Sequence, residues 1–382
     1  MDGVYTQDNN LGWIETALGK DHLLLERFEG TDRVNGLFEY KAQVLGRNGL
    51  DYDALLGTHA TVQLGTAAQD TAPFDGIVTE VEWLRGDFEG DHFLLTLRPW
   101  LWLAGRRRQQ RIFHEKKVNE ILDEVLKDWS SAGPSTFRMD LSQAYPELEY
   151  TVQYGESDFA FACRMMERFG ISYHFEHEAG NHCMVLTDAH ESMGELPGLS
   201  REYRPIGEFY RKDEEHFWEW REARGVTTGK VKLADYNFKK PGAKQVVEQL
   251  GDAEFAFGDI ESYDYPTGIE DTGTPGAARE PSRTASEGED DAARKALVQL
   301  RTTQERSADF RTHAAGDVIS LKSGMRCVAR GPDAEFLGGA QHLCLEAHHD
   351  FTAKAYHSGG EEEDRAYKGR YVMTPVSAPF AP

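Results

Sequence analysis

Short apolar or alternating runs dominate the first hundred residues, and glycines separate them. Short, evenly spaced runs with glycine turns are typical of an antiparallel sandwich or barrel. We therefore predict a β-rich region at the start of the chain. Its five predicted strands cover residues 23–28, 38–45, 60–64, 74–83 and 92–97.

The spacing of apolar residues becomes helical after residue 105. Between residues 118 and 129 they recur at intervals of three and four, which predicts a helix with one buried face. A second helix is predicted over 157–169. Ser157 or Asp158 can cap its start, and Gly170 suits a left-handed exit.

A hairpin is predicted directly after the second helix. Residues 171–175 and 183–186 are apolar runs around a turn at Ala179-Gly-Asn181. Together with the two helices, this hairpin predicts a mixed α+β module over 106–202.

Strand character returns after residue 203 and continues to the end of the chain. An acidic segment rich in Gly, Pro, Ser and Thr interrupts it at 270–291, and we predict a loop there, followed by a helix over 292–307. The predicted strands cover residues 208–219, 229–236, 245–249, 318–321, 326–329, 342–348 and 369–373.

Composition narrows the class of protein. At about 150 residues per domain, 382 residues correspond to two or three domains. Lys and Arg total 42 against 65 Asp and Glu, a formal net charge of −23. So negative a charge disfavours non-specific binding to nucleic acid or to an anionic membrane. We therefore expect no nucleic-acid partner.

The start of the chain has neither the basic nor the apolar segment of a secretory signal. A run of about 18 apolar residues, as a membrane-spanning helix needs, is also missing from the sequence. We expect a cytoplasmic protein without stable membrane insertion, which a machine would have to carry if it leaves the cell. Its four cysteines show no CxxC spacing and are expected to be reduced: Cys163, Cys183, Cys327 and Cys344.

The predicted strand 342–348 contains the first candidate metal ligands. Period-two alternation would place His342, Cys344, Glu346 and His348 on one face. These residue types suit zinc. However, a strand rises about 3.3 Å per residue, so the two histidines would lie about 20 Å apart. A polar face of a half-buried barrel strand is the simpler interpretation.

The predicted hairpin contains the second candidate set. His174 and His177 would point to opposite faces of their strand, which makes them a poor chelating pair. His182 and Cys183 lie across the turn. We interpret these residues as hairpin surface and assign no metal ligand.

Catalytic and nucleotide-binding motifs are also missing. The sequence has no GxSxG elbow, no P-loop and no GxGxxG. A Ser-His-Asp triad built from distant residues stays open at this point. We assign no catalytic, cofactor-binding or metal residue, expect no cofactor, and expect that the protein is not an enzyme.

Two surface candidates remain. The basic run Gly105-Arg-Arg-Arg-Gln-Gln-Arg111 is interpreted as a solvated or subunit-facing patch, because no aromatic platform for nucleic acid follows it. Trp100 and Trp102 are interpreted as core or subunit-interface residues, since each can bury a large apolar area.

Several linked motifs resemble one family. They are Phe74-Asp-Gly-Ile-Val-Thr79, Arg98-Pro-Trp-Leu-Trp102, Arg111-Ile-Phe113, Val152-Gln-Tyr-Gly-Glu-Ser-Asp158 and Gly170-Ile-Ser-Tyr-His-Phe175. In order and spacing this set is similar to the N-terminal hub region of type VI secretion spike proteins (VgrG) and to phage late-control D tail hub proteins. The resemblance covers about residues 20–190 and thins beyond 200, where Lys322-Ser-Gly324 departs from the usual pattern.

The resemblance implies a fold of the α+β class, mainly β. Two small antiparallel β-barrels would occupy 1–105 and 203–382, with the α+β module at 106–202 between them. The second barrel would hold an inserted acidic loop and helix at about 241–308. Three chains would then present six barrels as a pseudo-hexameric ring.

The function that the resemblance implies is mechanical. The ring would cap the tube of Hcp, couple it to the spike and help to deliver effectors. Implied partners are two further copies of the chain, Hcp, a PAAR-type spike-tip protein, baseplate proteins and effectors. The protein would be cytoplasmic before firing and then secreted by the machine without a signal peptide.

Family members continue into an OB-fold and a β-helix needle, which this sequence does not contain. The sequence is then either a piece of a longer chain or a naturally split hub, and we expect it to form trimers only weakly by itself. A phage baseplate hub is the alternative function. A metal-dependent effector hydrolase that uses the histidine-rich strands is a further one.

Overall fold

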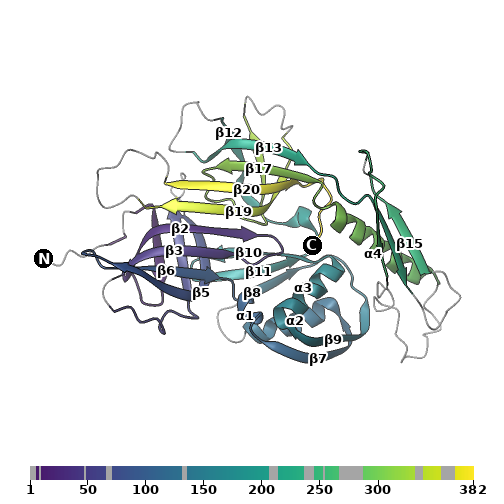
Figure 1. Cartoon of the computed structure of the whole chain (residues 1–382), viewed down its shortest axis with the longest axis horizontal. Helices are drawn as coiled ribbons and strands as arrows, with labels where there is room; N and C mark the ends of the chain where they lie inside the picture. The colour runs from purple at the N-terminus through teal and green to yellow at the C-terminus, as the bar shows by residue number, and fades with distance from the viewer. Residues whose placement is uncertain are drawn as a thin grey trace.

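The computed structural model describes residues 6–7, 10–46, 49–65, 71–130, 136–205, 214–235, 245–252, 254–265, 287–331, 339–353 and 366–382. Its main feature is a twelve-stranded sheet with the order β1-β4-β5-β6-β3-β2-β19-β18-β12-β13-β17-β20. Each half of this sheet contributes six strands. Figure 1 shows the two halves side by side, with β2 next to β19 where they meet. The expected mainly β fold is confirmed.

The first half of the sheet contains the five strands predicted near the N-terminus and one more. All its neighbours pair antiparallel. The additional strand, β1, spans only five residues and was too short to show a period. The strands are β1 (Gly12–Thr16), β2 (Leu23–Arg33), β3 (Glu39–Gly46), β4 (His59–Gly65), β5 (Thr71–Gly86) and β6 (Asp91–Arg98).

Gln7 bridges the seam between the two end strands of this half. Its Oε1 accepts hydrogen bonds from the amides of Ile14 (3.0 Å) and Leu25 (3.1 Å), and its Nε2 donates to the Ile14 carbonyl (3.2 Å). One side chain thus replaces part of a backbone ladder between β1 and β2. In the described residues the first half is therefore a curled sheet joined by a side chain, and the closed barrel that the resemblance implies is not confirmed.

The second half closes into a six-stranded barrel, because β19 pairs with both β18 and β20. It departs from the antiparallel expectation, since β12 runs parallel to β13 and to β18. Parallel neighbours need long connections, and β12 follows the inserted module instead of a hairpin turn. The strands are β12 (Glu195–Tyr203), β13 (His216–Arg224), β17 (Phe310–Gly316), β18 (Arg326–Arg330), β19 (His342–Thr352) and β20 (Tyr367–Pro375).

In the part of the chain that the structure describes, one antiparallel strand pairing joins the two halves. Strand β19 pairs with β2 from Glu346↔Arg33 to Thr352↔Arg27. The side chains of both halves then pack from the two sides of this junction, with Phe28 and Phe351 among the buried residues. The long, shared strand makes the two halves one continuous sheet.

The strand predicted at 318–321 is wrong. These residues form a turn after β17, in which the Leu321 amide donates to the Val318 carbonyl. Both side chains are nevertheless fully buried in the barrel core. The apolar run reports burial at the barrel, and a short run cannot distinguish a buried strand from a buried turn.

The first inserted module lies between the two halves in sequence. Both predicted helices and the predicted hairpin are confirmed. Ser157 Oγ accepts from the Ala160 amide at 3.1 Å, and Gly170 has φ 67°, so both ends of the second helix have the expected caps. The elements are α1 (Leu101–Ala104), β7 (Arg108–Lys117), α2 (Val118–Ser130), β8 (Thr136–Asp140), β9 (Glu147–Ser157), α3 (Asp158–Phe169), β10 (Ser172–Glu178), β11 (Asn181–Thr187) and η1 (His190–Ser192).

A second insertion lies between β13 and β17. Three strands pack against one helix around a small core of Val231, Leu233 and Val298. The predicted helix is confirmed and begins at Glu287, five residues before the predicted start at 292. The acidic loop predicted before it lies mostly outside the described residues. The elements are β14 (Lys230–Asp235), β15 (Gln245–Leu250), β16 (Glu261–Asp264) and α4 (Glu287–Arg306).

Candidate functional site

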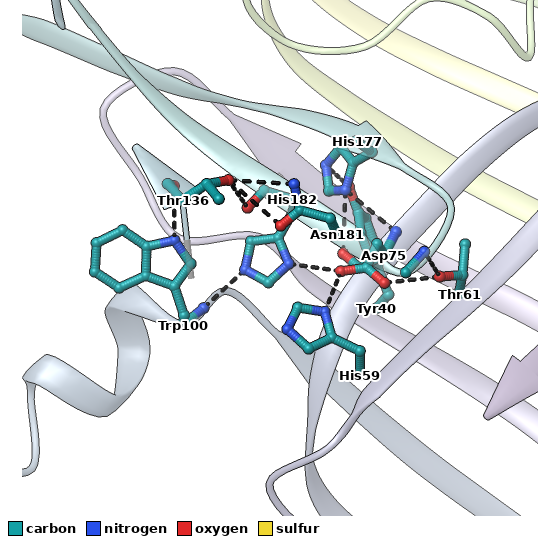
Figure 2. A network of polar contacts seen from close by, with 10 residues as sticks. Tyr40, His59, Thr61, Asp75, Trp100, Thr136, His177, Asn181 and His182 are labelled. Atoms are coloured by element: carbon teal, nitrogen blue, oxygen red, sulfur yellow. Dashed lines mark hydrogen bonds and ion pairs between the residues drawn. The ribbon is translucent and has the colours of Figure 1, made fainter. Parts of the chain in front are cut away.

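A buried carboxylate lies in the middle of β5. Asp75 is fully buried between Phe74 and Gly76, in a strand that is otherwise apolar at this point. Its Oδ1 lies 2.7 Å from Nδ1 of His59 and 2.7 Å from Nδ1 of His182. Its Oδ2 accepts from the Thr61 hydroxyl at 2.7 Å. A buried carboxylate is tolerated only with such partners, so Asp75 is the centre of a polar network (Figure 2).

This network joins the first half of the sheet to the inserted module. His59 and Thr61 come from β4 and Asp75 from β5, whereas His182 comes from β11. The Gly180 amide, in the β10–β11 turn, donates to Thr61 Oγ1 at 2.9 Å. The hairpin is thus held to the sheet by hydrogen bonds on both sides of Asp75 (Figure 2).

The ligand atoms of His59, Asp75 and His182 are close enough together to suggest a metal site. The proton on His182 decides against it. The Trp100 amide, which can only donate, lies 2.9 Å from Nε2 of His182. Nε2 must therefore be unprotonated, so Nδ1 of the neutral ring carries the proton and donates it to Asp75. His182 then has no lone pair left for an ion, and the cluster works as a hydrogen-bond centre.

His177 extends the network toward the interior of the first half. It pairs directly with His182 across the hairpin, and the two rings face the same side. Its Nε2 lies 3.2 Å from the Tyr40 hydroxyl, and its Nδ1 lies 3.2 Å from the Asp75 amide. Burial holds the pKa of His177 well below its ordinary value, which favours the neutral ring.

The pKa values of Asp75 and His182 are both held below their ordinary values, for different physical reasons. Burial alone would raise the pKa of Asp75, but hydrogen bonds from His182 and His59 outweigh it and hold that pKa below its ordinary value. Burial lowers the pKa of His182 in spite of its bond to Asp75. At neutral pH the pair is therefore a carboxylate bonded to the neutral ring of His182.

A second buried cluster lies where the two halves of the sheet meet. Asp32 Oδ1 lies 2.7 Å from Nε2 of His349, whose Nδ1 lies 2.7 Å from the Tyr367 hydroxyl. Asp32 Oδ2 accepts from the Ser323 amide at 2.7 Å. The hydrogen bonds connect β2, β19, β20 and the turn after β17.

The two clusters are adjacent. The His349 ring packs on Phe74, with 4.7 Å between centroids, and Phe74 precedes Asp75. The Lys322 ammonium lies 4.5 Å from the centroid of the Phe74 ring and donates to the Pro73 carbonyl. Burial lowers the pKa of Lys322 to about 8. Both halves of the sheet and the inserted module therefore meet around Pro73–Asp75, which we name the joint.

The structure divides the first candidate metal set between two environments. The pairing of β19 with β20 shifts register between Cys344 and Glu346, a β-bulge. Cys344 is buried in the barrel core, and His342 is buried against Trp220. Glu346 and His348 are half-buried and bond to each other at 2.7 Å. The predicted common face is therefore wrong, because the bulge breaks the period-two alternation.

The second candidate set is divided as the sequence predicts for its two histidines. His177 faces Tyr40 and the joint, whereas His174 lies under Gly324 on the other side of the hairpin. A Cβ added to Gly324 would lie 2.4 Å from the His174 ring, and Gly324 has a φ of 81°. Burial lowers the pKa of His174 to about 4. Cys183 pairs with Glu176 in the hairpin and is half-buried. His174 and His182 are buried, and His177 and Cys183 are half-buried, so the expectation of hairpin surface is wrong for the first two.

Half of the basic run is used inside the module. Asp158 is fully buried at the start of α3 and accepts from Arg107 Nε at 2.6 Å, from Trp129 Nε1 at 3.1 Å and from Gln153 Nε2 at 2.9 Å. Arg111 lies 3.5 Å from the same carboxylate. The interpretation as solvated or subunit-facing patch is therefore wrong for Arg107 and Arg111.

The two tryptophans differ. Trp100 is fully buried, and its Nε1 donates to the Thr136 carbonyl at 3.2 Å, which confirms it as core. Trp102 is partly exposed and lies beneath the guanidinium of Arg106 at 4.2 Å from its ring centroid. The Arg-Pro-Trp-Leu-Trp motif thus buries one ring, whose backbone amide donates to His182, and leaves the other ring near the surface.

Sequence reasoning missed His59 and Asp75 as partners of the hairpin. One signal was available: Asp75 interrupts an apolar strand between Phe74 and Ile77, where an acid must be buried. Its partner His182 is 107 residues away in the chain, which no local pattern reveals.

Two further structural findings bear on function. Within the described residues, every helix falls short of the length and apolarity that crossing a membrane requires. The four cysteines carry free thiols, of which Cys327 and Cys344 are buried in the barrel.

Comparison with known proteins gives consistent similarities. The family model of the phage tail baseplate hub (GPD) matches residues 31–355. The type VI secretion system spike protein VgrG1b of Pseudomonas aeruginosa is 36% identical over 263 residues, which are 68% of this chain and 35% of that protein. The chain thus spans about a third of the length of this relative.

Two solved structures share the fold. The E. coli c3393 protein, a component of the type VI secretion system, superposes with a TM-score of 0.65 at 16% identity, over 94% of this chain and 76% of that one. The tail protein from Neisseria meningitidis MC58 superposes with a TM-score of 0.62 at 10% identity, over 97% of both chains.

Proposed function

Because this chain belongs to the phage tail baseplate hub (GPD) family, we propose that it is a structural hub at the base of the spike of a type VI secretion machine. The 36% identity to a type VI spike protein supports this machine as the setting. The joint then has a structural role, because its buried polar groups are bonded to one another and fix how the modules meet.

The observation that carries the proposal is the division of one sheet into two six-stranded halves. Three copies would supply six such halves. A ring of that kind has pseudo-sixfold symmetry and can rest on a tube with six subunits per layer, although the spike above it is threefold. The β2–β19 pairing and the joint support this arrangement, because both connect the two halves of the sheet.

The proposed partners follow from this geometry. They are two further copies of the chain, the hexameric tube protein Hcp, baseplate proteins, and a PAAR-type tip protein and effectors carried by the spike. The protein would reside in the cytoplasm before firing and be carried outward by the machine. It would act mechanically and not as an enzyme.

Electron microscopy of the chain mixed with assembled tube protein tests the proposal. We expect density on tube ends, with threefold symmetry in averaged end views. Tube protein mixed with another acidic β-protein of similar net charge is the control, because the chain carries a charge of −23. Bare tube ends at saturating concentrations of the chain would refute the tube-capping role.

A phage baseplate hub is the second candidate. The similarity to the Neisseria tail protein, over 97% of both chains, favours it. Binding to two tubes, one of type VI tube protein and one of phage tail tube protein, separates the candidates. We expect tighter binding to the type VI tube, and preference for the phage tube would reverse the assignment.

The metal-dependent hydrolase has little support. Its candidate residues on β19 lie on different sides of a bulge, and His182 has no lone pair for an ion. Elemental analysis after dialysis against zinc, for the chain and for His348→Ala, is the decisive measurement. Stoichiometric zinc that His348→Ala abolishes would revive this alternative.

A further inference from the structure

The two-stranded ribbon β7–β9 covers the helices of the inserted module with one face only. Its inner face packs Phe113 on Phe161, with ring centroids 5.4 Å apart. Its outer face aligns Ile112 with Val152 and Gln110 with Tyr154. Ile112 is 63% exposed and Tyr154 79% exposed. The ribbon therefore presents an apolar and aromatic outer face, unusual for a folded chain without a partner.

Tyr154 belongs to a motif whose other polar residues have structural roles. Gln153 bonds to Asp158, and Ser157 caps α3. Within the described residues the Tyr154 ring makes no comparable bond, and it points outward beside Gln110. The neighbouring Tyr150 is also exposed and contacts the His114 ring. We name the outer face of Gln110, Ile112, His114, Tyr150, Val152 and Tyr154 the ribbon face.

A second exposed apolar group lies at the end of the β5–β6 hairpin. Phe88, in the turn, is 92% exposed, and Trp83 and Leu84 on β5 are exposed as well. The hairpin end is nevertheless held in place. His92 lies 2.8 Å from Asp87 Oδ2 and 2.8 Å from Glu26 Oε2, which ties the turn to β2. We name residues 80–91 the hairpin tip.

Among the described residues, these two surfaces carry exposed charges of opposite sign without an ion-pair partner, whereas the exposed Arg85 of the hairpin tip pairs with Asp87. Glu80 and Glu82 are exposed on the hairpin tip, and neither has a cationic partner among the described residues. Arg106 and Arg108 are exposed beside the ribbon face, and within the described part of the chain neither pairs with a carboxylate. The other two arginines of that run already bond to Asp158.

We propose that the hairpin tip of one copy of this chain docks on the ribbon face of a second copy, with Glu80 and Glu82 against Arg106 and Arg108. Each chain has one surface of each kind, so the contact is head-to-tail and can close into a ring when the rotation fits. Aromatic and arginine side chains are typical of such interfaces. This inference rests on the trimeric ring of the proposed function and names its surfaces.

Charge reversal and charge exchange test the docking. The protein is the full chain, and the measurement is its weight-average mass by sedimentation equilibrium over a concentration series. We expect Glu80→Arg with Glu82→Arg to weaken association about tenfold or more, because like charges would then face each other. Arg106→Glu with Arg108→Glu should weaken it equally.

The sharp test is the combination of the four substitutions, which restores opposite charges with their positions exchanged. We expect association to return to within about threefold of the natural chain. A combined variant that associates no better than either double variant would overturn the proposal. The matched control is Asp51→Arg with Asp53→Arg, because both acids are exposed and lie outside the two surfaces. This variant should change association little.

Disulfide crosslinking tests the same contact without changing any charged residue. Phe88→Cys mixed with Tyr154→Cys should give disulfide-linked dimers under mild oxidation, whereas each variant alone should not. Dimers of Tyr154→Cys alone, or linkage to an added tube protein instead, would show that another occupant covers the ribbon face. Trimers that form without this crosslink overturn the docking and leave the proposed ring intact. A chain that stays monomeric throughout, with and without tube protein, overturns both.

Discussion

Asp75 and His182 lie 107 residues apart in the chain, and their Oδ1 and Nδ1 atoms meet at 2.7 Å, both fully buried. The direction of this bond is fixed by a third residue, since the Trp100 amide occupies Nε2 of His182. The two ring nitrogens of His182 thus hydrogen-bond the hairpin to β5 on one side and to the segment after β6 on the other.

Asp75→Asn should destabilise the protein by about 2–4 kcal/mol. The amide has one acceptor oxygen where the carboxylate has two, so its NH2 group must face either the two histidine donors or the Thr61 hydroxyl. The free energy of unfolding from urea denaturation measures this loss.

The matched control is Asp350→Asn. Asp350 pairs with Arg27 on the surface, where both side chains are about half exposed. An exposed pair contributes about 1 kcal/mol or less, so this variant should unfold almost like the natural chain. Equal losses for the two aspartates would contradict the role of the joint.

Asp158→Asn should loosen the ribbon locally. It removes the charge that Arg107 and Arg111 share and weakens the bonds from Gln153 and Trp129, at a cost of about 3 kcal/mol. Hydrogen exchange should accelerate in β7 and β9, while the barrel strands β17 and β20 keep their protection.

Asp128→Asn provides the comparison, because Asp128 binds the same two arginines from the surface. We expect a loss below about 1 kcal/mol and unchanged exchange in the ribbon. If Asp128→Asn loosened the ribbon as strongly, the buried carboxylate would not be its anchor.

The protein should lose stability as the pH falls below 6.5. The pKa of His174 is lowered from 6.5 to about 4 in the folded state, so between these values the unfolded chain binds a proton that the folded chain does not. Stability from this group is fully present above pH 6.5 and declines as the pH falls toward 4, by about 3 kcal/mol in total. His177 and His182, whose pKa values are also lowered, act in the same direction.

His174→Leu should flatten this pH dependence. Nδ1 of His174 is buried without a partner among the described residues, so the leucine removes a titrating group without breaking a hydrogen bond there. Urea unfolding at pH 7 and pH 5 measures the difference, with His114→Gln on the exposed face of β7 as the control. If the free energy of unfolding of His174→Leu fell between pH 7 and pH 5 as much as that of the natural chain, other groups would cause the loss of stability in acid.

Gln7→Ala should open the seam between β1 and β2. Three hydrogen bonds disappear, and the Ile14 and Leu25 amides lose their acceptor, for a loss of about 2 kcal/mol. Hydrogen exchange at these two amides should accelerate most. Exchange that rises equally in β6, away from the seam, would indicate a general loss of stability instead.

Local interactions explain what the sequence determined. The helices α2 and α3 followed from apolar spacing and from caps at Ser157 and Gly170, all within a few residues of one another. The same is true of the β10–β11 hairpin and of most long strands. The residues of the linked motifs act locally as well, since Gln153 bonds to Asp158 and Ser157 caps α3 through the Ala160 amide.

Contacts between distant segments decided the rest, and only the tertiary structure contains them. The strands β7, β8 and β9 are polar or irregular in sequence and exist because they pair with each other or with β11. The bulge in β19 moves His342 and Cys344 into the barrel and leaves Glu346 outside. The run at 318–321 showed burial correctly but could not show that the chain turns there.

The joint illustrates the physical reason for this division. A buried carboxylate such as Asp75 requires donors nearby, and the sequence shows that requirement where an acid interrupts an apolar strand. Which donors satisfy it depends on how β4, β5 and β11 come together in space. The sequence thus set the need for partners, and the packing of the modules selected His59 and His182.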